Sequence, residues 1–474
     1  MIQPLTLNEQ KLFNIRLTGL IVSALFLSAC QSVGPNYTRP ELPVPAQYSE
    51  TVDQTSSKVS QTWWTQYQDA TLNALLDKAL QNNADIKLAI ARIDEAEAFA
   101  NEVGAATLPQ VDLNAGASRT RSTELGGNPV NVNPRNNYKA QLGTAFEVDF
   151  WGKIARAKES ARAQVLSSRY AKDTVALSLS GLVTGNYLVL RSLDSQIAIV
   201  QNNIKSRDES LALTKRRLEG GVASGLDVRQ AEVATANLSA QLAELNRLRA
   251  LSLHQLAVLT GDLSLHIAGA DIQALPVPPT PPAGLPSALL EARPDVRQAE
   301  EQMIAANAKI GVAKAALYPT ISLTASLGGE SLELGDILKS AARIWTGGVS
   351  LYLPIFDSGK LNARVDQASA KQKQALASYE SAVQSAFREV NDALVNLRQN
   401  TEREAALYRS QEAAKKALAI SENRYQSGYS AYLDVLDAQR VYNDAALSFV
   451  QSRQARLLAT VDLFKALGGG WQAN

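Results

Sequence analysis

The chain has 474 residues, 46% of them hydrophobic and only 6% aromatic, and a formal net charge of +1. Because binding to phosphate backbones needs a clear basic surplus, this charge gives no basis for a nucleic-acid partner. The only cysteine, Cys30, excludes an intrachain disulfide and a thiolate metal cluster, and His254 and His266 lie far from any group of candidate ligands. We therefore expect no metal and no cofactor, and the abundance of Ala, Leu, Gln and Ser favours long helices.

Residues 1–29 have the pattern of a secretory signal peptide. Lys11 and Arg16 precede the apolar run LTGLIVSALFLSA, which is too short to span a bilayer. The run ends in LSAC, which resembles the lipobox of bacterial lipoproteins, so Cys30 is the expected anchor in outer-membrane lipid. The residue after Cys30 is Gln31 and not an aspartate, which resembles the signal for sorting to the outer membrane. An ordinary signal peptide that happens to contain a cysteine is the alternative.

Two Pro-rich segments divide the rest of the chain. Residues 30–62 are expected to be extended, and residues 275–286 form a linker between a first half, residues 63–274, and a second half, residues 287–474. The stretch RLEGGVASGLDVRQAEV, which begins at Arg217, matches RYQSGYSAYLDVLDAQR 207 residues later. Other matches occur 207 or 210 residues apart. Such self-similarity predicts an internal duplication, with one architecture made twice.

Each half has the same order of predicted elements: an Ala-rich helix, a pair of strands, a long helix, a tight turn and a shorter returning helix. Apolar and polar residues alternate in the strands, and the helices are long runs of helix formers without proline. At 1.5 Å per residue, a helix of about 65 residues would be roughly 100 Å long, which no compact domain needs. In chain order we expect helix 74–106, strands 109–150, helices 153–219 and 226–260, helix 286–316, strands 319–356, and helices 360–426 and 433–467.

The long helix of the first half carries a heptad-like seam, in which mostly apolar residues recur at steps of three and four from Leu190 to Leu218. Arg207 and Thr214 are its polar members. The equivalent seam of the second half is poorer, with Glu404 and Gln411. A narrow apolar seam between polar faces favours helices that lie side by side in a wall over a bundle with a solid core.

Four strands with an apolar face cannot close a barrel within one chain, and an open sheet edge is not viable in lipid. If the strands enter a membrane, several chains must pool them. A trimer would supply 12 strands, an even number within the range of known barrels, and 12 helical columns. The alternative for these segments is four surface strands of a soluble domain.

Several segments together resemble one known family, in an order that covers the entire mature chain. They are the lipobox, WWTQYQDATLNALLDKALQNNADIKLA, GLPSALLEARPDVRQAE, LYPTISLTAS, LPIFDSGKL, the repeated turn and LFKALGGGW. They resemble the TolC-like outer-membrane factors, in particular the OprM-type lipoprotein exit ducts of tripartite efflux systems. The resemblance implies a homotrimer with a 12-stranded barrel in the outer membrane and a 12-helix barrel in the periplasm. It also implies a periplasmic adaptor (a membrane fusion protein) and an inner-membrane RND-type pump as partners, passive conduction of drugs, and no enzymatic activity.

The resemblance further implies a gate at the turn of the second half. Positions that match Leu433 and Asp437 form constriction rings in the family. Three Asp437 side chains in a narrow lumen would repel one another, favour cations and make closing pH-dependent. Tyr425 and Arg440 are expected to lock the gate, although the basic residue that related ducts carry after the tyrosine is Gln426 here. The alternative role for Asp437 is to stabilise the N-terminus of its own helix.

The two turns, which we call the tips, are the expected adaptor contacts. Their small residues allow a partner helix to approach closely, although turns require such residues in any case. These residues are Gly220, Gly221, Ser224, Gly225, Ser427 and Gly428. Asp227 and Asp434 are the expected helix caps, and Asp227 has capping-box spacing from Ser224. Since the first half has Gln230 where the second has Asp437, the second hairpin is predicted to move and the first to be a fixed wall.

An exit duct is thus the leading interpretation of the sequence. The alternative is a structural periplasmic coiled-coil lipoprotein without a pore. An enzyme is disfavoured, because the sequence has no G-x-S-x-G, no Walker loop, no H-E-x-x-H and no paired Cys or His ligands.

Overall fold

The computed structural model describes residues 32–43, 45, 48, 59–123, 133–281 and 290–471. The predicted signal peptide, Cys30 and the last part of the Pro-rich linker lie outside these residues. The chain divides into two compact units, which we call the sheet unit (residues 1–41, 93–168 and 299–379) and the hairpin unit (residues 42–92, 169–298 and 380–474). Within the described residues, no helix combines the length and the apolar character needed to cross a membrane.

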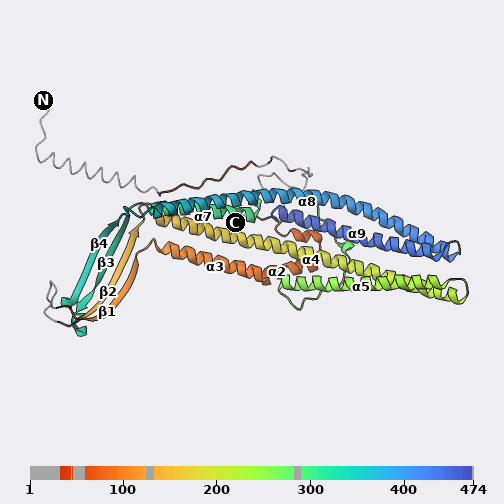
Figure 1. The fold of residues 1–474 in the computed structure, drawn as a ribbon, viewed down its shortest axis with the longest axis horizontal. Coiled ribbons are helices and arrows are strands. Elements are labelled where there is room, and N and C mark those ends of the chain that lie inside the picture. Colours follow the sequence, from red (N-terminus) through yellow and green to blue (C-terminus); the bar gives the residue numbers. More distant parts are fainter. Residues whose placement is uncertain are drawn as a thin grey trace, which may run out of the picture. The chain divides into compact units, whose positions relative to one another are not determined.

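Four antiparallel strands form the sheet of the sheet unit, and they lie side by side in chain order, β1-β2-β3-β4 (Figure 1). They are β1 Gln110–Thr120, β2 Arg135–Val148, β3 Thr320–Ser331 and β4 Arg343–Tyr352. Both predicted strand pairs are therefore present. The central pairing joins the two halves of the chain, because β2 pairs with β3 in a register that sets Leu142 opposite Leu327.

One face of the sheet is apolar and exposed. Leu113, Leu142, Leu327 and Trp345 lie opposite one another across all four strands. Their side chains are 70%, 51%, 62% and 80% exposed, respectively. Strands β1 and β4 also each have one edge without a partner strand among the described residues. An apolar patch of this kind marks a surface that contacts lipid or another protein.

The extended N-terminal segment predicted by the sequence runs along helix α7, Pro294–Ala315, in the sheet unit. Asn307 donates a hydrogen bond to the carbonyl oxygen of Pro35 (3.0 Å), and Arg39 forms an ion pair with Glu300 (3.0 Å). A Cβ atom at Gly311 would lie 2.8 Å from a backbone oxygen of this segment, so only glycine fits there. The segment is therefore held against α7 by specific contacts.

The prediction of one helix over residues 74–106 is wrong, because two helices, α2 Ala70–Asn82 and α3 Ala84–Ala105, occupy this stretch. The side-chain oxygen of Asn83 accepts a hydrogen bond from the backbone nitrogen of Asp85 (2.8 Å). Its amide nitrogen donates to the carbonyl oxygen of Leu259 (2.9 Å). Asn83 thus caps the second helix and is bonded to Leu259 of the same unit, and the first helix ends at Asn82.

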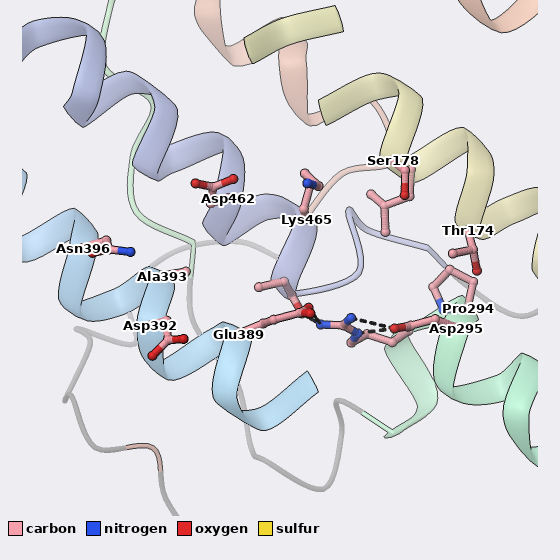
Figure 2. A pocket seen from close by; sticks show the side chains of 13 residues that line it. Thr174, Ser178, Pro294, Asp295, Glu389, Asp392, Ala393, Asn396, Asp462 and Lys465 are labelled. Atoms are coloured by element: carbon pink, nitrogen blue, oxygen red, sulfur yellow. Dashed lines mark hydrogen bonds and ion pairs between the residues drawn. The ribbon is translucent and has the colours of Figure 1, made fainter. Parts of the chain in front are cut away.

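The second Ala-rich helix, predicted over residues 286–316, is also interrupted, at Arg293. The residue before a proline is disfavoured in the helical conformation, and Pro294 follows. The buried guanidinium of Arg293 donates two hydrogen bonds to Asp295 (3.0 and 2.6 Å) and pairs with Glu389 (2.7 Å) beside a cavity of about 410 Å³ (Figure 2). Burial alone would lower the pKa of Arg293, but the two carboxylates outweigh it and raise the pKa.

Two helical hairpins follow the strand pairs. They consist of α4 Lys153–Glu219 with α5 Gly225–Thr260, and of α8 Lys360–Gln426 with α9 Tyr432–Ala466. Both long helices have 67 residues, and all four predicted helices are confirmed to within one residue at each end. The predicted seam of α4 is buried at Leu190, Val200 and Thr214, each at 0% exposure, but Leu218 at its tip end is 40% exposed.

Glu404, which weakens the predicted seam of the second half, has two partners that explain its position. Its side chain is 8% exposed and accepts hydrogen bonds from Arg453 (3.1 Å) and Arg456 (2.8 Å) of helix α9. A buried carboxylate is tolerated only when it is paired and hydrogen-bonded. The acid therefore joins α8 to α9 by charge where the apolar seam fails.

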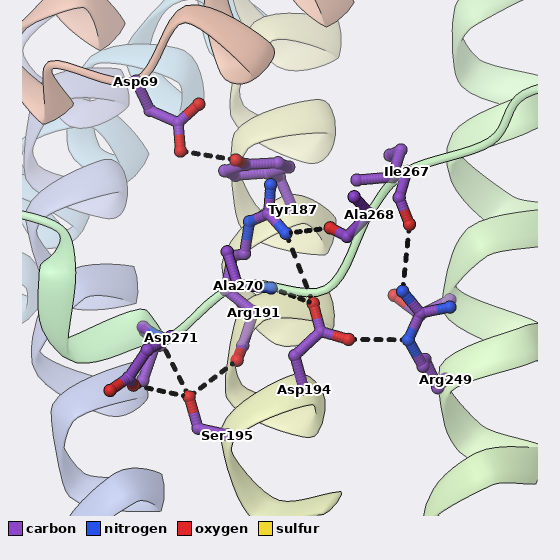
Figure 3. A network of polar contacts seen from close by, with 12 residues as sticks. Asp69, Tyr187, Arg191, Asp194, Ser195, Arg249, Ile267, Ala268, Ala270 and Asp271 are labelled. Atoms are coloured by element: carbon purple, nitrogen blue, oxygen red, sulfur yellow. Dashed lines mark hydrogen bonds and ion pairs between the residues drawn. The ribbon is translucent and has the colours of Figure 1, made fainter. Parts of the chain in front are cut away.

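The segment after α5 is fixed to α4 by a second polar network (Figure 3). The side chain of Asp194, 6% exposed, accepts hydrogen bonds from Arg191 (3.3 Å) and Arg249 (2.6 Å). It also accepts one from the backbone nitrogen of Ala270 (3.2 Å), while Arg191 donates to the carbonyl oxygen of Ala268 (2.6 Å). The hydrogen bonds of this buried acid therefore hold the loop in place.

The buried core of the hairpin unit joins the two ends of the chain. Trp63 of the 3-10 helix η1, Trp63–Tyr67, is 0% exposed and stacks on Phe464 near the end of α9, with ring centroids 5.2 Å apart. The hydroxyl groups of Tyr67 and Thr460 are hydrogen-bonded at 2.6 Å. The segments WWTQY and LFKAL, which lie at opposite ends of the sequence, therefore share one core.

The two tips begin their returning helices differently. The first has a capping box: the Ser224 side chain accepts from the backbone nitrogen of Asp227, whose carboxylate accepts from the backbone nitrogen of Ser224. The second has Ala431 as N-cap, without a side-chain hydrogen bond. The predicted cap at Asp227 is confirmed. Asp434 lies in the first turn of α9, where an acid stabilises a helix N-terminus, but it has no capping-box partner because the N-cap residue is Ala431.

Replacing Glu404 by Ala is expected to destabilise the α8–α9 hairpin by about 3 kcal/mol, because two partly buried arginines lose their carboxylate. The matched control is Glu402→Ala, which removes an exposed acid that lies 3.5 Å from Arg398 and should cost well under about 1 kcal/mol. Thermal unfolding followed by circular dichroism measures both. Equal midpoints for the two variants would contradict the structural role of Glu404.

The tips predict a second contrast. Ser224→Ala should cost about 1 kcal/mol of local stability, because the first turn of α5 loses its capping acceptor. Ser430→Ala should cost nothing, since the Ser430 hydroxyl is buried and no described residue bonds to it. Hydrogen exchange of the backbone amides in the first turns of α5 and α9 measures the effect. Faster exchange in both variants would argue against this difference.

Candidate functional site

Three of the predicted gate residues form one stripe on helix α9. Leu433, Asp437 and Arg440 are spaced by four and three residues, so they lie on the same helix face. The Arg440 guanidinium donates to Asp437 at 2.8 Å and lies 3.6 Å from Asp444 one turn further on. The hydrogen bond and charge of Asp437 raise the pKa of Arg440. Within the single chain this stripe is exposed, with Leu433 at 58%.

The stripe borders a cavity of about 440 Å³ in the hairpin unit. Helix α9 contributes Leu433, Leu436 and Asp437 to its walls, α5 contributes Leu238, and α4 contributes Arg207. Apolar and charged groups therefore meet in one concave surface. Small-molecule sites commonly have this composition and lie within a range of about 300–1,000 Å³.

Tyr425 lies in a different cluster from Arg440, the other residue predicted to lock the gate. Its ring faces the guanidinium of Arg217 at 4.3 Å from the ring centroid, and lies 5.4 Å from the ring of Tyr432. Tyr432 and Val435 are buried in the same apolar cluster. A cation–π contact of this kind stabilises by about 0.5–1 kcal/mol at exposed sites. It joins the end of α8 to the end of α4, and so links the two hairpins.

Two residues of this region were missed by the sequence analysis as functional candidates. Arg217 is the first residue of the repeated turn, and that position was the only available signal. Arg207 was recognised only as a polar member of the α4 seam. Burial lowers the pKa of Arg207, and the nearby Tyr432 and Asp444 oppose this effect.

All of the residues predicted to contact an adaptor are exposed at the tips. Gly221 and Gly428 have φ angles of 73° and 82°, a backbone conformation that side chains rarely adopt. Large apolar side chains stand beside them, with Val222 77%, Leu226 65% and Tyr429 78% exposed. The tips therefore combine small residues with uncovered apolar groups, a composition typical of protein contact surfaces.

Comparison with known proteins agrees with this architecture. The family model described as "Outer membrane efflux protein" matches residues 75–262 and 285–469. The pyoverdine export outer membrane protein OpmQ of Pseudomonas aeruginosa is 35% identical over 466 residues, which cover 96% of this chain and 97% of OpmQ.

Two solved channels have the same fold. The outer-membrane channel OprN aligns with a TM-score of 0.87 and 32% identity, over 93% of this chain and 100% of its own. The MtrE channel of Neisseria gonorrhoeae, in its open state, aligns with a TM-score of 0.85 and 31% identity, over 93% of this chain and 98% of its own. The chain therefore belongs to the outer membrane efflux protein family.

Proposed function

We propose that the chain is the exit duct of a tripartite efflux system, a lipid-anchored channel that passively conducts drugs or other small toxic molecules across the outer membrane. The observation that carries this proposal is that one chain combines an exposed apolar sheet with two free edges and two hairpins whose long arms have 67 residues. A membrane surface and a long periplasmic tube require these two features. The family relationship supports the same conclusion.

The proposed duct is a homotrimer. In the described part of the chain, one sheet of four strands leaves β1 and β4 unpaired at its edges, and unpaired backbone groups are not tolerated in lipid. Pairing of β4 with β1 of the next chain would satisfy both edges. Three chains would then close a barrel of 12 strands, whose apolar face would contact the bilayer.

The helical part of the proposed duct arises from an internal duplication. Its support is the equal length of α4 and α8 and the near-equal length of α5 and α9, with 36 and 35 residues. Three chains would contribute 12 helical columns to a periplasmic barrel. The exposed tips would then contact a periplasmic adaptor, which connects the duct to an inner-membrane RND-type pump.

The proposed gate lies at the start of α9. Threefold symmetry would bring three copies of Leu433 and Asp437 together, and the like charges of the Asp437 ring would favour cations in the lumen. Opening requires the second hairpin to move away from the first. The contact between Arg217 and Tyr425 opposes this movement, because it joins the ends of α4 and α8.

A structural periplasmic lipoprotein without a pore is the competing function. Such a protein would have no use for an apolar sheet face with 51–80% exposed side chains in one row. We therefore favour the duct, and single-channel recording separates the two possibilities.

Purified protein in a planar lipid bilayer is expected to show discrete conductance steps. Asp437→Ala should raise the conductance several-fold, because a ring of charges and its pairing with Arg440 are removed from the narrowest point. Gln230→Ala, at the aligned position of the first hairpin, is the matched control and should leave the conductance unchanged. No conductance from either the natural protein or the Asp437 variant would refute the pore.

Lipid anchoring is tested separately. Cells that make the natural protein in the presence of labelled palmitate should incorporate the label, and Cys30→Ser should abolish incorporation because no other cysteine exists in the chain. Membrane fractionation of the same cells checks that the variant is still exported. Label that persists in the variant would show that Cys30 is not the acylated residue.

A further inference from the structure

Arg207 is a buried cation without a partner. The residue is 8% exposed, and within the described part of the chain no group forms a hydrogen bond or ion pair with its guanidinium. The only carboxylate that acts on it at a distance is that of Asp444, which lies near Arg440. Glu404 shows the ordinary arrangement at such a seam position, because two arginines neutralise it. A buried charge is costly unless a partner compensates it.

The helical architecture itself does not need a cation at this position. The aligned residue of the second hairpin, 207 positions later, is Ala414, which is 6% exposed. Arg440 and Asn443 likewise align with Val233 and Ala236 of the first hairpin. The polar groups around Arg207 are therefore specific to this side of the hairpin unit, which points to a role other than helix packing.

Arg207 lines the cavity of about 440 Å³ between α4, α5 and α9, which we call the Arg207 pocket. Residues with amide donors line the same cavity. The side-chain oxygen of Asn443 already accepts from Asn203, so its amide nitrogen is left to donate, and Asn237 and Gln241 add amides from α5. Leu238, Leu433 and Leu436 form an apolar wall.

The charges that face the pocket favour an anion. Two arginines, Arg207 and Arg440, line it, against one acidic residue, Asp437. That carboxylate is already paired with Arg440 at 2.8 Å. Asp444 is not among the residues that line the pocket; it lies 3.6 Å from Arg440 and acts on Arg207 only at a distance. The positive charge of Arg207 is thus the one that remains without a partner in this set.

We propose that the Arg207 pocket binds a small organic anion, with its carboxylate on the Arg207 guanidinium and the neighbouring amides and its apolar body against the leucine wall. Guanidinium and carboxylate match in geometry and form strong, charge-assisted hydrogen bonds. This binding site is an addition to the exit-duct function proposed above. Binding of an anion to it can be measured without transport and without an adaptor or pump.

The test uses the purified full-length protein, with sodium benzoate as the probe and benzamide as the uncharged probe of the same shape. Isothermal titration calorimetry should show benzoate binding at least tenfold more tightly than benzamide. Arg207→Met should abolish this difference. Arg247→Met, which removes an exposed arginine of α5 paired with Glu244 at 2.6 Å, should preserve it. Equal binding of benzoate and benzamide by the natural protein would overturn the proposal, whatever the variants do.

Thermal unfolding gives a second readout. Benzoate should raise the unfolding midpoint of the natural protein, because it binds the folded state, and should leave that of Arg207→Met unchanged. Without benzoate the variant should unfold no earlier than the natural protein, since methionine removes an uncompensated charge. A lower midpoint in the variant, together with no effect of benzoate on the natural protein, would mean that protein groups already satisfy Arg207, and the proposal would be wrong.

Discussion

The long hairpins of this chain depend on a narrow seam of buried side chains, in which every charge has to be neutralised locally. In a bundle with a solid core, many apolar contacts can offset the cost of one buried polar residue. Two helices that touch only along a stripe have too few apolar contacts to do so. Glu404 meets this requirement with two arginines, and Asp194 meets it with two arginines and a backbone nitrogen. Arg207 occupies the same kind of position, and no described residue forms such a pair with it. That contrast makes it stand out from the other buried charges.

The two hairpins have the same lengths but differ in how firmly their tips are fixed. The first returning helix starts with a reciprocal capping box, whereas the second starts at an alanine without a side-chain cap. The second tip is instead attached by its aromatic residues, with Tyr425 against Arg217 and Tyr432. Such a contact can be broken without unwinding a helix. This difference suits a fixed first hairpin and a movable second one.

The sequence predicted the strands and the long helices well, because their signals are local: alternation in the strands, and uninterrupted helix formers between glycine-rich turns. The first Ala-rich helix was mispredicted, because the role of Asn83 depends in part on a bond to Leu259, far away in the chain. The second is interrupted at Arg293, where Pro294 was a local signal that the prediction did not use. The same limit applies to the site. The spacing of Leu433, Asp437 and Arg440 placed them on one face, but the contact between Arg217 and Tyr425 depends on how two distant helices pack. Glu404 looked like a defect until its partners on α9 were known.

The pairing of β2 with β3 has a consequence for symmetry. Each half of the chain supplies one strand hairpin, so this central pairing has the same form as the pairing proposed between neighbouring chains. Six identical half-length chains could build the same ring, but each would then have to carry the same residues at its tip. In the proposed trimer, joining the halves covalently would reduce sixfold equivalence to threefold. One hairpin of each pair would then be free to acquire an acid such as Asp437 while the other keeps Gln230, and the proposed ring would hold three charges where full equivalence would force six.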